Sequence, residues 1–236
     1  MRVVQHFQEG QLPKRMKKIV IRPIPKKGDR LQIKNWRPIS LINTDYKILS
    51  RVYSNKISNV IENLLTSDQS YRVPGRSIYE NLHIIRNIIK HSNQTNSPLA
   101  ILSLDQTEAF NEISQPYLHH LLKVHGFGPK IRKSIAAFLD NTQGYVKIES
   151  SLLAPFNFKI GVRQGDPLAG PFFNLAIEPF LLAVKNNTNI RGYQIPMTTT
   201  KVITGKVAIL IGNFAPSRQC IVKYTIFRKS YRHRAV

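Results

Sequence analysis

The spacing of apolar residues changes several times along this chain, and the changes predict a fold that mixes strands with helices. Over 19–25, β-branched residues alternate with polar residues or proline, as they do in a half-buried strand. Over 44–65 the spacing is helical instead, and Asn43 or Thr44 can cap the start. The apolar face predicted for this helix consists of Ile48, Leu49, Val52, Ile57, Val60, Ile61 and Leu64. Similar patterns predict helices over 79–91, 116–124, 129–139 and 167–185, and strands over 99–104, 144–148 and 156–160.

The charge of the chain is strongly unbalanced. It has 35 Lys and Arg residues against 13 Asp and Glu residues, a formal net charge of +22. A field of this strength attracts polyanions and makes their binding depend on salt. Nucleic acid is therefore the leading partner, although ribosomal and membrane-surface proteins can carry a similar excess. After Glu178 the sequence has no acidic residue, and its end lacks a clear amphipathic period.

Several classes of protein are disfavoured by what the sequence lacks. A single cysteine, Cys220, excludes an internal disulfide framework, and the seven histidines have no metal-ligand spacing, so we predict no zinc site. No apolar run is long enough to cross a membrane, and residues 1–10 lack the apolar core of a signal peptide. We therefore expect an intracellular protein without a membrane partner, nuclear or cytoplasmic.

One carboxylate stands where catalysis could use it. The apolar run over 99–104 ends directly before Asp105, which places this side chain at the end of a predicted strand. A carboxylate at such a position can hold Mg²⁺, because this cation prefers oxygen ligands. An Asp that caps a turn is the alternative, and it would be favoured if Asp105 stood alone.

Four segments resemble, in order, the reverse transcriptase domain of non-LTR (LINE-type) retrotransposons. They are 24–29 with 36–41, then 69–81, 102–111 and 161–179, and the resemblance covers residues 12 to 203. It implies an α+β fold of the right-hand polymerase kind, with fingers and an antiparallel palm sheet backed by helices, and with the thumb absent. The implied division is a fingers-like region over 1–100, a palm-like region over 101–212 and an atypical basic tail over 213–236.

The resemblance also assigns roles to individual residues. Asp105 matches the first metal-binding carboxylate, which makes it the candidate catalytic residue and Mg²⁺ ligand. The residues matched to nucleotide binding are Lys26, Arg37, Phe110, Gln164 and Gly165. Those matched to template binding are Arg72, Gly75, Arg76, Asn81 and Arg163. The alternatives are ordinary ones, namely a solvated basic face, a core Phe, and a turn before a helix over 163–167.

The resemblance breaks where the family carries its second acidic motif. Family members have a hairpin with Tyr or Phe, any residue, and Asp-Asp at its turn. Here 201–203 and 207–211 resemble the hairpin arms, while Thr204, Gly205 and Lys206 stand where the acidic turn belongs. Asn111 also departs from the Asp that is common in the family. A lysine in place of metal ligands opposes Mg²⁺ binding by both charge and chemistry.

The family activity is therefore expected to be lost in this chain. That activity is RNA-templated DNA synthesis by two-metal nucleotidyl transfer, with dNTP and an RNA or RNA–DNA hybrid template–primer as partners. One alternative is a non-catalytic module that binds RNA or RNA–DNA hybrid. Another is an unstable product of a decayed element, since an interrupted palm hairpin exposes sheet edges and apolar surface.

Overall fold

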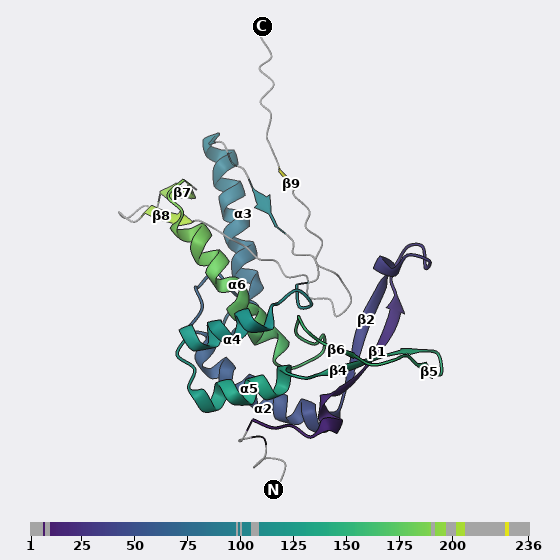
Figure 1. The fold of residues 1–236 in the computed structure, drawn as a ribbon. Helices are drawn as coiled ribbons and strands as arrows, with labels where there is room; N and C mark the ends of the chain where they lie inside the picture. The colour runs from purple at the N-terminus through teal and green to yellow at the C-terminus, as the bar shows by residue number, and fades with distance from the viewer. Residues whose placement is uncertain are drawn as a thin grey trace. The chain divides into compact units, whose positions relative to one another are not determined.

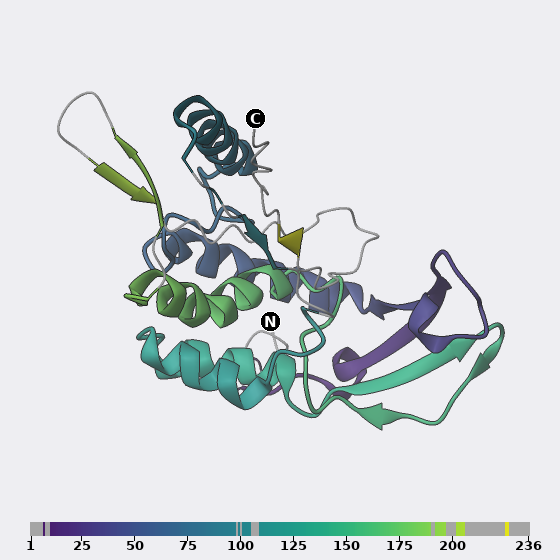
Figure 2. The same ribbon diagram turned by 90° about the horizontal axis from the view of Figure 1, so that it is seen from above.

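The computed structural model describes residues 7, 10–97, 99, 101–104, 109–189, 192–196, 202–205 and 225–226. The chain forms two compact units, Met1–Leu64 with Ala109–Ala176, and Leu65–Glu108 with Ile177–Val236. Both units combine helices with strands, as Figures 1 and 2 show, so the predicted α+β class is confirmed. The division at residues 100 and 212 into fingers-like region, palm-like region and tail stays a prediction. Among the described helices, none is both long and apolar enough to cross a membrane.

The first unit contains a mixed sheet of five short strands. These are β1 (Lys18–Pro25), β2 (Trp36–Ile42), β4 (Gln143–Ile148), β5 (Ser151–Leu152) and β6 (Phe156–Asn157). Their order is β2-β1-β4-β5, with β6 also paired to β4. β1 runs antiparallel to β2 from Ile19 opposite Ile42 onward, and parallel to β4. The strands predicted over 19–25 and 144–148 are confirmed, whereas the one predicted over 156–160 is shorter.

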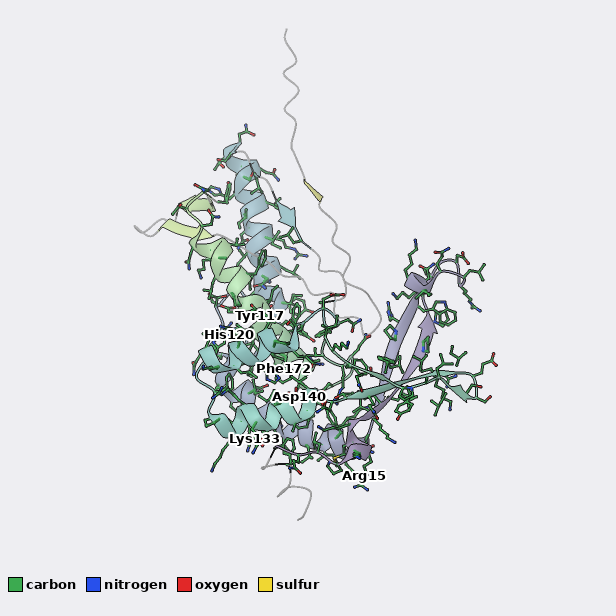
Figure 3. The ribbon with its side chains drawn as sticks, viewed as in Figure 1. Arg15, Tyr117, His120, Lys133, Asp140 and Phe172 are labelled. Atoms are coloured by element: carbon green, nitrogen blue, oxygen red, sulfur yellow. The ribbon has the colours of Figure 1, made fainter. Side chains whose placement is uncertain are left out.

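The helical elements of the first unit are the short 3-10 turns η1 (Lys14–Lys17) and η2 (Ile33–Asn35), the helices α2 (Thr44–Ile61), α4 (Gln115–Val124) and α5 (Pro129–Leu139), and the first part of α6 (Ala169–Asn186). Two of these helices, α2 and α4, begin at side-chain caps. The Asn43 side chain accepts the Asp45 N–H at 2.9 Å, which satisfies an N–H that the helix leaves without a partner. Tyr117 on α4 donates its hydroxyl to the Ala176 carbonyl of α6 at 3.2 Å, and Figure 3 labels Tyr117 on α4 and Phe172 on α6.

Helix α2 buries only part of the predicted apolar face, Ile57 and Ile61, and buries polar residues beside it. The buried residues are Tyr46, Ser50, Ser54, Ile57 and Ile61. Ile48 is 60% exposed and Val52 is 47% exposed, although both were assigned to the apolar face. The assignment was wrong because three polar residues spaced four apart find hydrogen-bond partners in the interior, and burial of a satisfied polar group costs little.

An aromatic cluster forms the centre of the first unit. Phe138 of α5 lies 4.7 Å from Phe7, 5.1 Å from Tyr46 and 5.7 Å from Tyr53, measured between ring centroids. These edge-on and tilted contacts are the ones that aromatic rings prefer. Phe138 has no exposed surface, so it joins α5 to α2 through ring packing.

The second unit contains α3 (Ile78–Thr95), the later part of α6 and two strand pairs. Strand β3 (Leu102–Ser103) pairs antiparallel with β9 (Thr225–Ile226), which lies in the segment predicted to be a tail. β7 (Tyr193–Pro196) pairs antiparallel with β8 (Val202–Gly205). Helix α3 starts where Ser77 accepts the Tyr79 N–H at 3.2 Å.

The second strand pair corrects one expectation about the missing acidic motif. Thr204 lies opposite Gln194 and Gly205 opposite Tyr193, so both residues are in a strand and not in a turn. The hairpin joins 193–196 to 202–205, because those backbones share a continuous antiparallel register. Lys206 and the predicted second arm over 207–211 lie outside the described residues.

Substitution of Phe138 by Ala should destabilise the first unit by about 3–5 kcal/mol, because it removes a fully buried ring and leaves a cavity between α2 and α5. The matched control is Phe156→Ala, which removes a ring that is 42% exposed and should cost under about 1 kcal/mol. Urea denaturation followed by circular dichroism measures both values. Equal losses would show that the aromatic cluster does not stabilise this unit.

Candidate functional site

Residues 163–166 form a tight turn whose tip is displayed to solvent. The Asp166 N–H donates to the Arg163 carbonyl at 3.0 Å, and Gly165 has a φ of +100°. A positive φ at the third residue is what a type II turn requires, and glycine adopts it without strain. The two corner residues are buried, with Arg163 6% and Asp166 7% exposed, whereas Gln164 is half-buried and Gly165 exposed.

The Arg163 corner is fixed by its guanidinium group. Nη2 donates to the Phe138 carbonyl at 2.5 Å and also to the Thr142 hydroxyl. The guanidinium carbon lies 4.4 Å from the centroid of the Tyr46 ring, within the range of a cation–π interaction. The side chain is therefore held from the end of α5 and from α2.

The Asp166 corner is fixed by its carboxylate. It accepts hydrogen bonds from the Tyr46 hydroxyl at 2.5 Å, from the Leu168 N–H at 2.9 Å and from the Ser50 hydroxyl. Burial, and after it the negative charge of Asp166, raises the pKa of the Tyr46 hydroxyl well above its usual range. Tyr46 therefore keeps its proton at neutral pH and remains a donor to the carboxylate.

These contacts correct the template-binding role predicted for Arg163. Its guanidinium points into the interior of the unit, where a carbonyl, a hydroxyl and an aromatic ring contact it. A template strand at the surface would not reach a side chain that is 6% exposed. The adjacent alternative, a turn before a helix, describes 163–167 correctly, since α6 starts at Ala169.

A second segment that matches the family packs directly against this one. The Val162 N–H donates to the Phe110 carbonyl and the Gly161 N–H to the Ile113 carbonyl, each at 2.7 Å. A Cβ atom on Gly161 would lie 2.6 Å from the Asn111 carbonyl oxygen, so the close approach of the two backbones requires glycine there. Phe110 is half-buried, with its ring centroid 5.5 Å from that of Phe173.

The basic residues matched to nucleotide binding lie in the hairpin of β1 and β2. Lys26 follows β1, and its Nζ donates to the Lys34 carbonyl at 3.0 Å. Arg37 lies on β2 opposite Ile24 and is half-buried. A Cβ on Gly165 would come within 3.8 Å of the Ser40 carbonyl oxygen, so the turn lies beside β2. The first unit therefore contains Lys26, Arg37, Phe110, Gln164 and Gly165.

The residues matched to template binding, apart from Arg163, lie in the second unit. Arg72 is exposed, with its guanidinium carbon 5.7 Å from the Tyr71 ring centroid, and Gly75 is exposed with a φ of +75°. Asn81 donates to the Ser70 hydroxyl at 3.0 Å. Arg76 donates to the carbonyls of Leu65, Thr66 and Gln69 at 3.4, 2.5 and 2.9 Å, so its guanidinium holds the loop before α3.

The acidic residues available for a metal are few. Asp105 lies outside the described residues. Glu178 is 1% exposed and accepts the Thr66 N–H at 2.8 Å and a hydrogen bond from the Gln69 side chain, so it is committed to structure, as Asp166 is. Among the described residues, no three His, Cys, Asp or Glu side chains gather into a possible metal site. Mg²⁺ binding therefore stays a family expectation, because its candidate ligand lies outside the described residues.

Tyr46 and Ser50 are the site residues that the sequence analysis missed. Their signal was present in the four-residue spacing of Tyr46, Ser50 and Ser54, which places them on one side of a helix. Ser54 donates to the Pro167 carbonyl at 2.9 Å, so all three contact the segment after Arg163. The two residues were missed because the helix was predicted from its apolar residues alone.

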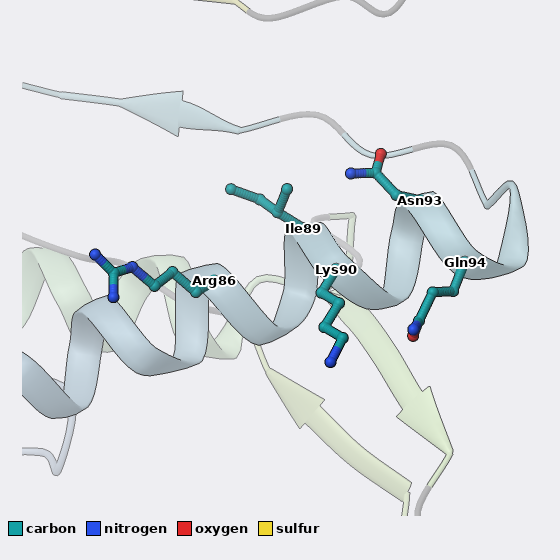
Figure 4. Close-up of a pocket in the computed structure, with 5 residues that line it drawn as sticks. All are labelled: Arg86, Ile89, Lys90, Asn93 and Gln94. Carbon is teal, nitrogen blue, oxygen red and sulfur yellow. The ribbon is translucent and has the colours of Figure 1, made fainter.

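A separate open hollow runs along α3 (Figure 4). It is lined by Arg86, Ile89, Lys90, Asn93 and Gln94. None of the residues matched to nucleotide or template binding lines it.

Comparison with known proteins places the chain in a family. Residues 24–199 match the family described as reverse transcriptase (RNA-dependent DNA polymerase). The chain is 42% identical over 183 residues to the transposon TX1 uncharacterized 149 kDa protein of Xenopus laevis, which covers 78% of this chain and 14% of that protein. It is also 24% identical over 189 residues to the retrovirus-related Pol polyprotein from type-1 retrotransposable element R2 of Popillia japonica. That match covers 79% of this chain and 26% of the polyprotein.

The fold has a relative of known structure. Apo telomerase from Candida tropicalis, truncated from its C-terminal domain, superposes with a TM-score of 0.55 at 15% identity, over 83% of this chain and 46% of that one. This likeness confirms the α+β polymerase fold implied by the motifs. The chain belongs to the reverse transcriptase (RNA-dependent DNA polymerase) family, as a domain of the non-LTR retrotransposon type.

Proposed function

We propose that this chain binds nucleotide and an RNA–DNA hybrid template–primer without catalysing DNA synthesis by itself. The proposal rests on the burial and hydrogen bonding of the two acidic residues that follow Gly161. Asp166 and Glu178 are both buried, and each accepts hydrogen bonds from several donors. Neither is free to join Asp105 around a metal ion.

Catalysis by this family depends on carboxylates that hold two metal ions. Two cations offset the charge that develops on the attacking and leaving oxygens, and a single carboxylate does not supply enough oxygen ligands for them. Thr204 and Gly205 offer no carboxylate, and no Asp or Glu follows Glu178 in this chain. Asp105 alone would then bind Mg²⁺ weakly, so nucleotide binding is the part of the activity that we expect to persist.

The exposed turn tip supports a nucleotide-binding role. Gln164 presents an amide with both a donor and acceptors, and Gly165 allows a base or sugar to approach the backbone closely. The tip lies beside β2, the strand that carries Arg37, and Arg37 can contact phosphate oxygens with its fork of N–H donors. Lys26 adds a second cation in the same unit.

The second unit supports template binding through its exposed loop before α3. Arg72 is exposed, and its contact with Tyr71 leaves the guanidinium able to reach phosphates. Arg76 and Asn81 hold this loop, so we assign them to shaping the template surface. Such a role requires access to RNA and is compatible with an intracellular location in either the nucleus or the cytoplasm.

No primer extension is expected from the purified chain on poly(rA)–oligo(dT) with Mg²⁺ or Mn²⁺, because Asp166 and Glu178 are held by internal hydrogen bonds. Asp105→Ala is the matched control, and it should give the same blank result. Extension by the unaltered chain that disappears in Asp105→Ala would show that catalysis survives and would contradict the proposal.

Binding of a fluorescently labelled RNA–DNA hybrid should persist, and its affinity should fall by a factor of roughly 10³ between 50 and 200 mM salt, as expected for six or more phosphate contacts. Binding that ignores salt would exclude a phosphate-contacting surface.

Arg72→Glu should weaken hybrid binding about tenfold, because it reverses an exposed charge on the template loop. Lys123→Glu makes an equal charge change at an exposed residue of α4, and it should have a much smaller effect on hybrid binding.

The unstable-product alternative makes a separate prediction. It requires the chain to unfold without a cooperative transition, and the denaturation curve used for Phe138→Ala measures this directly. A single steep transition for the first unit, together with hybrid binding, would exclude it.

A further inference from the structure

One tyrosine touches both corners of the 163–166 turn. The Tyr46 ring lies under the Arg163 guanidinium, and the Tyr46 hydroxyl donates to the Asp166 carboxylate. Tyr46 has no exposed surface, and it is itself fixed by its edge-on contact with Phe138. A rigid side chain from α2 therefore controls the two ends of a turn that lies more than a hundred residues further along the chain.

The geometry of a tight turn makes its corners decisive for its tip. In a type II turn the first and fourth residues are joined by one hydrogen bond, so their separation and orientation set the direction of the two central residues. Gly165 is exposed and has little support of its own. The nearest atom to a Cβ on Gly165 would be the Ser40 carbonyl oxygen, at the ordinary contact distance of 3.8 Å. The tip must therefore be aimed from its corners.

We infer that Tyr46 is a positioning residue, which aims the Gln164–Gly165 tip toward bound nucleotide by holding Arg163 with its ring and Asp166 with its hydroxyl. The inference rests on the proposed nucleotide-binding function of that tip. It also gives Arg163 and Asp166 a role in nucleotide recognition that involves no contact with the ligand. Ser50 and Thr142 are secondary anchors, because each contacts one corner and not the other.

The contacts of Tyr46 can be removed in two steps. Tyr46→Phe keeps the ring beneath Arg163 and removes the hydroxyl, which donates to Asp166 and also interacts with Arg163, so it releases the Asp166 corner and leaves the ring contact with Arg163 in place. Tyr46→Leu removes the ring as well and releases both corners. Tyr53→Phe is the matched control, because Tyr53 lies in the same aromatic cluster and donates to the Ser134 hydroxyl at 3.0 Å, away from the turn.

The test combines amide hydrogen exchange with two binding measurements on the full chain. The reporter is the Asp166 amide, which closes the turn, compared with amides of α5 in the same unit. We expect Tyr46→Phe to speed Asp166 exchange about tenfold while α5 changes much less, because only local opening is affected. Affinity for a fluorescent dTTP analogue, corrected for the folded fraction, should fall about tenfold. Hybrid affinity should stay unchanged, and Tyr53→Phe should alter none of these values.

Tyr46→Leu should lower the dTTP affinity further than Tyr46→Phe does, since the second corner is also released. A uniform rise in exchange across the first unit, with dTTP affinity per folded molecule unchanged, would make Tyr46 a purely structural residue and overturn the inference. If the unaltered chain binds no dTTP, the proposed function fails instead. In that case the exchange of Asp166 relative to α5 still decides whether Tyr46 holds the turn.

Discussion

The buried carboxylate of Asp166 is the constraint on which the first unit depends. Moving an ionised carboxylate out of water is costly unless hydrogen-bond donors replace the water that it loses. Tyr46 and Ser50 supply two donors from α2, and the Leu168 N–H supplies a third at the start of α6. These requirements fix the register of α2 against the turn and against the first residues of α6. Arg163 adds a positive charge nearby and donates to the Phe138 carbonyl of α5, so the polar contacts link three helices around the Phe138 cluster.

The second unit solves the same problem with a different acid. Glu178 is buried, and the loop before α3 provides its donors through Thr66 and Gln69, while Arg76 holds three carbonyls of that loop. Two of the few acidic residues in a chain of net charge +22 therefore serve the architecture. In a polymerase of this family, carboxylates near the catalytic centre would be expected to hold metal ions. Here Asp166 anchors the turn that carries Gln164, and Glu178 anchors the loop before α3.

The sequence was a good guide to secondary structure and a poorer guide to which side chains are buried. The helix over 129–139 and the strands over 19–25 and 144–148 were predicted correctly, because local periodicity and proline positions specify them. The apolar face of α2 was predicted only in part, because Ile57 and Ile61 are buried but Ile48 and Val52 are exposed, while polar Tyr46 and Ser50 are buried. A polar residue can be buried at little cost when the fold supplies a hydrogen-bond partner for it. Those partners lie more than a hundred positions away, so the pattern within the helix could not reveal them.

What the sequence determined by itself was the family, the order of its motifs and the absence of any Asp or Glu after Glu178. It also determined that 163–166 can form a tight turn, since Gly165 is the residue that such a turn needs. Only the tertiary structure decided what each charged residue does. Arg72 and Arg163 are the same residue type, and both were assigned to the template, yet one is exposed and the other lies inside the first unit. The physical reason is that the free energy of an arginine in the interior depends on carbonyls, hydroxyls and rings supplied by distant segments, and only the folded chain brings those groups together.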